Sequence, residues 1–102
     1  MDIHYAREQF GNAYWEIFSG DGTLQERLAK AWKHIMLLKG AGLPAELQEM
    51  ADEILRLLED GKPAADAPSI EEGIRLLPKA TAKVIVNRIW KLDAAFTDHI
   101  RG

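Results

Sequence analysis

Three histidines, His4, His34 and His99, have side chains that titrate near neutral pH and commonly ligate metals. No two of them stand three or four residues apart, and none belongs to the Glu-x-x-His pair typical of di-iron carboxylate bundles. Cysteine is absent, which excludes thiolate metal sites, disulfides and cysteine nucleophiles. The sequence therefore predicts no metal site and no cofactor, and favours histidines at helix surfaces and helix ends.

Arg27 and His34 stand at a spacing that is known from catalysis. On a helix, residues seven positions apart lie two turns from each other and within about 20° on one face. This pair resembles the Arg-x(4–6)-His signature of the HEPN family of helical-bundle ribonucleases, although Leu28 stands where that family commonly has a polar residue. The resemblance covers eight residues and implies a phosphate-binding arginine, an acid–base histidine and two subunits completing one site. A solvated arginine and histidine on a helix flank is the other interpretation.

Other catalytic patterns are absent from the sequence. It holds no phosphate-cradling glycine loop, dinucleotide fingerprint, His-Glu-x-x-His motif or nucleophile elbow. Its many carboxylates fall on predicted outer helix positions, whereas acid–base catalysis needs a sheltered pair. We therefore assign no catalytic residue and favour a function without catalysis.

Composition predicts one soluble globular domain spanning residues 1–102. Hydrophobic residues make up 47% of the chain and charged residues 28%, and a chain of 102 residues can bury a substantial core. The N-terminal residues lack the features of a signal peptide, and no stretch approaches the roughly 20 apolar residues of a membrane span. We expect a cytoplasmic protein with no membrane contact.

Turn residues divide the chain into pieces of helical length, and no piece shows the alternation of a strand. Helices are predicted over about residues 3–18, 23–38, 44–60, 70–76 and 79–99, with capping boxes at Thr23 and Ser69 and with Pro44 in the first turn of the third helix. Pro78 predicts either a break between the last two helices or a sharp kink. The expected fold is all-α, an up-and-down four-helix bundle with an additional short helix or proline kink near residues 70–78. The 61–69 connection is long enough to cross one end of the bundle.

Charge is unevenly distributed along the chain. Residues 43–72 hold nine acidic and two basic residues, and residues 78–102 hold five basic and two acidic ones. The simplest interpretation is that the acidic and basic helices pack side by side. The acidic third helix would be repelled by DNA phosphates, and only the last helix, with Lys79, Lys83, Arg88 and Lys91, could face nucleic acid. With a net charge of −3, we expect no nucleic-acid partner.

The first predicted helix has more aromatic surface than one buried face requires. Phe10 and Tyr14 belong to its apolar stripe, but Trp15 points about 150° away from the centre of that stripe. Gly11 costs about 1 kcal/mol of helix stability relative to alanine, which suggests close approach of another backbone or a pocket for a ring. Trp90 lies similarly off the stripe of the last helix. Internal packing is the simpler explanation, and a homodimer or partner interface is the alternative.

These patterns favour a non-catalytic helical interaction module, a small regulatory or adaptor protein that self-associates as a homodimer or binds one protein partner. The predicted interaction residues are His4, Gly11, Trp15, Phe18 and Trp90. A ribonuclease or nucleic-acid-processing bundle using Arg27 and His34 is the alternative function. A small ligand between the helices is a further possibility, but no residue pattern selects one.

Overall fold

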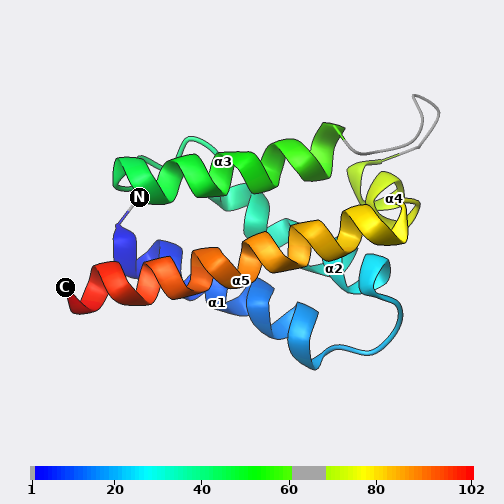
Figure 1. The fold of residues 1–102 in the computed structure, drawn as a ribbon, viewed down its shortest axis with the longest axis horizontal. Helices are drawn as coiled ribbons and strands as arrows, with labels where there is room; N and C mark the ends of the chain where they lie inside the picture. The colour runs from blue at the N-terminus through cyan, green and yellow to red at the C-terminus, as the bar shows by residue number, and fades with distance from the viewer. Residues whose placement is uncertain (1, 61–68) are drawn as a thin grey trace.

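A computed structural model describes residues 2–60 and 69–102, which form five α-helices and no strand (Figure 1). The elements are α1 (Ile3–Ser19), α2 (Leu24–Ile35), the 3₁₀ turn η1 (Met36–Leu38), α3 (Ala45–Asp60), α4 (Ile70–Arg75) and α5 (Lys79–Arg101). The predicted all-α class is confirmed. The finer arrangement as an up-and-down four-helix bundle remains a prediction.

The two predicted capping residues begin their helices as expected. The hydroxyl of Thr23 accepts a hydrogen bond from the Glu26 amide at 3.1 Å, and that of Ser69 accepts from the Glu72 amide at 3.2 Å. The return half of each capping box differs. The Glu26 carboxylate accepts from the Thr23 hydroxyl at 3.2 Å, and the Glu72 carboxylate pairs with Arg75. Each glutamate therefore contacts a side chain where the motif predicts a backbone amide.

The second and third helices meet at a turn that differs slightly from the prediction. The α-helix ends at Ile35 and the chain continues as η1, which still buries Leu38. Gly40 (φ +63°) and Gly42 (φ +72°) then adopt left-handed conformations that other residues rarely take. Pro44 precedes α3 and does not lie in its first turn. Its carbonyl accepts a hydrogen bond from the Gln48 amide at 2.9 Å, which is the bond expected of the residue just before a helix.

Pro78 breaks the helix, as the first of the two alternatives predicted. Helix α4 ends at Arg75, and Pro78 has an extended ψ of 144°. The Pro78 carbonyl accepts from the Ala82 amide at 3.0 Å, which is the first hydrogen bond of α5. The predicted closure of the third helix at Gly61 and the expected course of the 61–69 connection fall on residues 61–68, which lie outside the described part of the chain.

One continuous core receives side chains from every helix, and α1 and α5 meet in it as antiparallel neighbours. Near one end Arg7 of α1 pairs with Asp93 of α5 at 3.1 Å. Next to this pair the rings of Phe10 and Phe96, both fully buried, lie with centroids 5.4 Å apart. The same register brings the C-terminal end of α1 beside the first half of α5.

The acidic and basic helices lie side by side, as their charges predicted. Figure 1 shows α3 running along α5, and the two helices are in contact. Across this contact Arg88 pairs with Glu53 at 2.8 Å. Within the described part of the chain, no helix has both the length and the apolar character required to cross a membrane.

Candidate interaction surface

Exposed aromatic rings gather where the C-terminal end of α1 meets α5. The rings of Tyr14 and Phe18 lie with centroids 4.3 Å apart, and Phe18 remains 45% exposed. Across the helix contact lies Trp90, which is 60% exposed. Phe18 and Trp90 line one shallow hollow together with Lys83, Val86 and Asn87. The fold therefore brings together two predicted interaction residues that are far apart in the sequence.

Trp15 lies one turn from Phe18 on α1 and is 70% exposed. Internal packing, the simpler explanation of the off-stripe tryptophans, is therefore wrong for both Trp15 and Trp90. Trp15 is exposed because α1 has one covered face, whose buried residues are Ala6, Phe10, Ala13 and Ile17. Trp90 likewise lies outside the buried face of α5. We call Tyr14, Trp15, Phe18, Val86 and Trp90 the α1/α5 surface.

His4 and Gly11 do not line the hollow. His4 is exposed at the start of α1, eleven residues and about 16 Å along the helix axis from Trp15. A Cβ atom built on Gly11 would meet one atom outside the local helix backbone, Nη1 of Arg7 at 3.4 Å. The expected close approach of another backbone at Gly11 is therefore not found within the described chain.

We expect the Gly11→Ala substitution to stabilise the protein by about 1 kcal/mol, because alanine is favoured over glycine inside a helix and the new methyl group meets only a flexible side chain. Thermal unfolding followed by circular dichroism measures the effect, with Asn12→Ala on the exposed side of α1 as the control. A loss of stability specific to Gly11→Ala would show that the added methyl group is not accommodated at this position.

Four residues of the site were missed by the sequence reasoning, and one of them, Asn87, was not considered at all. Tyr14 and Val86 were assigned to buried stripes, but both are only half-buried and lie at the edge of the exposed surface. Lys83 was considered only as part of a basic helix face. The four-residue step from Tyr14 to Phe18 was the available signal for the ring contact.

Arg27 and His34 both face α1. Nη1 of Arg27 donates to the Ile17 carbonyl at 2.6 Å, which is one of the last four carbonyls of that helix. Nε of Arg27 is buried and has no hydrogen-bond partner within residues 2–60 and 69–102. Nδ1 of His34 lies 3.4 Å from Oε1 of Gln9. The arginine thus caps the end of a neighbouring helix, which is a structural role.

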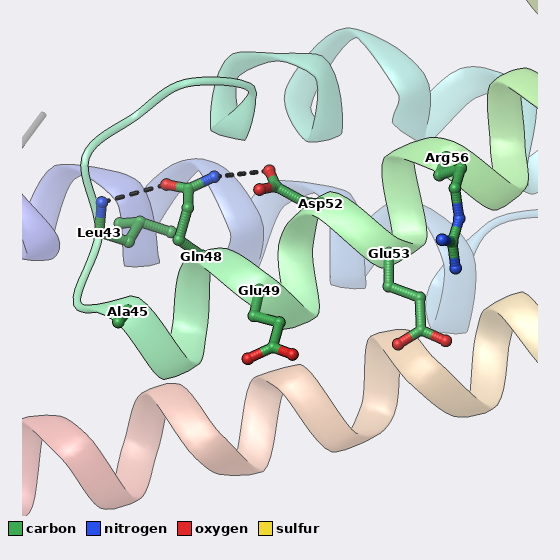
Figure 2. Close-up of a pocket in the computed structure, with 7 residues that line it drawn as sticks. All are labelled: Leu43, Ala45, Gln48, Glu49, Asp52, Glu53 and Arg56. Atoms are coloured by element: carbon green, nitrogen blue, oxygen red, sulfur yellow. Dashed lines mark hydrogen bonds between the residues drawn. The ribbon is translucent and has the colours of Figure 1, made fainter.

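The acidic face of α3 borders a second hollow, lined by Leu43, Ala45, Gln48, Glu49, Asp52, Glu53 and Arg56 (Figure 2). Gln48 organises it by accepting from the Leu43 amide at 3.1 Å and donating to Oδ1 of Asp52 at 2.8 Å. Glu53 is already paired with Arg88. Two of the three carboxylates are thus engaged within the fold, and no group of three or more acidic or histidine side chains suited to a metal ion occurs among the described residues.

No family model, curated protein or solved structure matches this chain. The interpretation of the α1/α5 surface therefore depends on its own chemistry.

Proposed function

We propose that the protein is a non-catalytic interaction module, a small regulatory or adaptor protein whose contact area is the α1/α5 surface. The observation that supports this proposal is that Trp15 and Trp90 are both exposed and that Trp90 lines one hollow with Phe18. Each large aromatic ring can bury about 150–250 Å² on contact, and such rings are enriched at the centres of protein interfaces.

Polar groups lie toward both ends of the α1/α5 contact, where the rim of an interface would be. The Arg7–Asp93 ion pair lies toward one end of the α1/α5 contact, and Lys83 borders the hollow near the other. A polar rim around an aromatic centre suits both a second copy of the chain and one different protein partner. Both forms of the proposal use the same side chains.

Sedimentation velocity over a range of concentrations tests the self-associating form. We expect Trp15→Ala and Trp90→Ala each to raise the dissociation constant of the dimer at least about tenfold, as truncation of a central aromatic residue does. Tyr5→Ala is the matched control, because Tyr5 is an exposed aromatic residue of α1 outside this surface.

A wild-type chain that remains monomeric at every concentration would reject self-association and leave the form with a different partner. Dimerisation that resists both tryptophan substitutions would reject the α1/α5 surface as the site of contact.

A further inference from the structure

The α1/α5 surface has a basic end. Of the residues that the structure describes, Lys83 is the one charged residue that lines the hollow between Phe18 and Trp90. One turn earlier on α5, Lys79 lines a neighbouring hollow together with Arg27 and the start of α2. Positions 79, 83 and 90 fall within about 40° on one face of the helix. We call the aromatic hollow and these two lysines, which lie on the same face of α5 as Trp90, the track.

Both lysines are exposed at the surface of α5. Across residues 2–60 and 69–102, neither Lys79 nor Lys83 forms an ion pair, whereas four other basic residues do: Arg7, Lys39, Arg75 and Arg88. Among the described residues, no carboxylate lines either hollow. Glu26 reaches toward Gly22, which lines the same hollow as Lys79. Its carboxylate accepts a hydrogen bond from the Thr23 hydroxyl. The track thus offers two exposed ammonium groups beside an apolar hollow.

We propose that the partner of the α1/α5 surface is an acidic amphipathic helix, an inference that depends on the function proposed above. Its apolar side chain would fill the hollow between Phe18 and Trp90, and its carboxylates would pair with Lys83 and Lys79. A groove between two antiparallel helices suits an amphipathic helix, and complementary charge selects the acidic ones.

The spacing of Lys79, Lys83 and Trp90 along α5 defines the sequence motif that we expect in the partner helix. Lys83 and Lys79 precede Trp90 by seven and eleven residues, or about 10 and 16 Å along the axis of α5. A partner helix lying along α5 therefore presents an apolar residue at position i and carboxylates at i+7 and i+11, which share one face.

Three other occupants fit the track less well. A second copy placed by two-fold symmetry on the same track would bring four lysines and no lining carboxylate together. Nucleic acids and anionic membranes would meet two free lysines on a chain with a net charge of −3, which opposes binding to a polyanion. These occupants are outcomes of the experiment below.

The probe is a 16-residue alanine- and glutamine-based helical peptide with leucine at positions 2 and 5 and glutamate at positions 9 and 13. Its binding to the full chain is followed by isothermal titration calorimetry, which does not depend on Trp90 as a reporter. We expect the double variant Lys79→Glu/Lys83→Glu to bind about tenfold more weakly than the wild type, because two attractive pairs become repulsive. A peptide with lysine at positions 9 and 13 should show the opposite preference. Lys30→Glu/Lys33→Glu on α2 changes the net charge equally and should leave binding unchanged.

Equal binding of the two peptides by the wild type, or equal effects of the two double variants, would overturn the acidic partner. Failure of the glutamate peptide to bind at millimolar concentration would also overturn it, as would tighter binding of a single-stranded oligonucleotide or an anionic vesicle through the same lysines. Loss of peptide binding in Trp90→Ala without any charge preference would retain the α1/α5 surface and reject only the acidic partner. Peptide binding unaffected by Trp90→Ala would reject the surface itself.

Discussion

Replacing Phe96 with alanine is expected to lower the free energy of unfolding by about 4 kcal/mol. Phe96 is fully buried, and its ring packs against Phe10 of α1. Truncation removes this contact and leaves a cavity that the neighbouring helices fill only in part. Because domains of this size are stable by only about 5–15 kcal/mol, much of the total would be lost. Urea unfolding followed by circular dichroism measures the change.

Trp90→Ala on the same helix is the control, because it removes a larger ring from an exposed position. We expect its effect on unfolding to remain within about 0.5 kcal/mol. Comparable losses in the two variants would mean that Trp90 is buried by the fold, which would contradict the exposure on which the interaction surface depends.

Sequence periodicity predicted the buried faces well. The stripe of the first helix contained Phe10, Ala13 and Ile17, all of which are buried. Helix bounds agreed closely, with α1 one residue and α5 two residues longer than predicted at their C-terminal ends. This success is expected because a helical repeat of apolar residues depends only on local geometry.

Periodicity could not predict which helix covers which face. Phe18 and Trp90 line one hollow because α1 and α5 pack in a particular antiparallel register, which long-range packing determines. For the same reason the sequence left Trp15 open to two interpretations, burial or an interface. The sequence could place Lys79 and Lys83 on the same helix face as Trp90, but it could not show that Phe18 of α1 lines the hollow with Lys83.

The sequence left two roles open for Arg27, phosphate binding in a ribonuclease and a solvated position on a helix flank. The solvated position is wrong, because Nε of Arg27 is buried. Its guanidinium donates to the Ile17 carbonyl at 2.6 Å and so satisfies an end of α1. We expect Arg27→Ala to lower the free energy of unfolding by about 2 kcal/mol, the usual cost of losing a hydrogen bond from a charged donor. Thermal and urea unfolding measure this loss. Lys30→Ala, at an exposed position of the same helix, should cost far less.

Incubation with RNA separates this capping role from the ribonuclease alternative. His34→Ala removes the contact between the imidazole and Gln9. If Arg27 only caps α1, the wild type, Arg27→Ala and His34→Ala should all leave RNA equally intact. Cleavage by the wild type that is lost in both Arg27→Ala and His34→Ala, at a temperature where each remains folded, would instead support the ribonuclease. The Arg27 guanidinium has five N–H donors, so it can keep its bond to the Ile17 carbonyl while other N–H groups bind a phosphate. The capping bond alone therefore does not decide between the two roles, and the RNA cleavage assay with the two variants does.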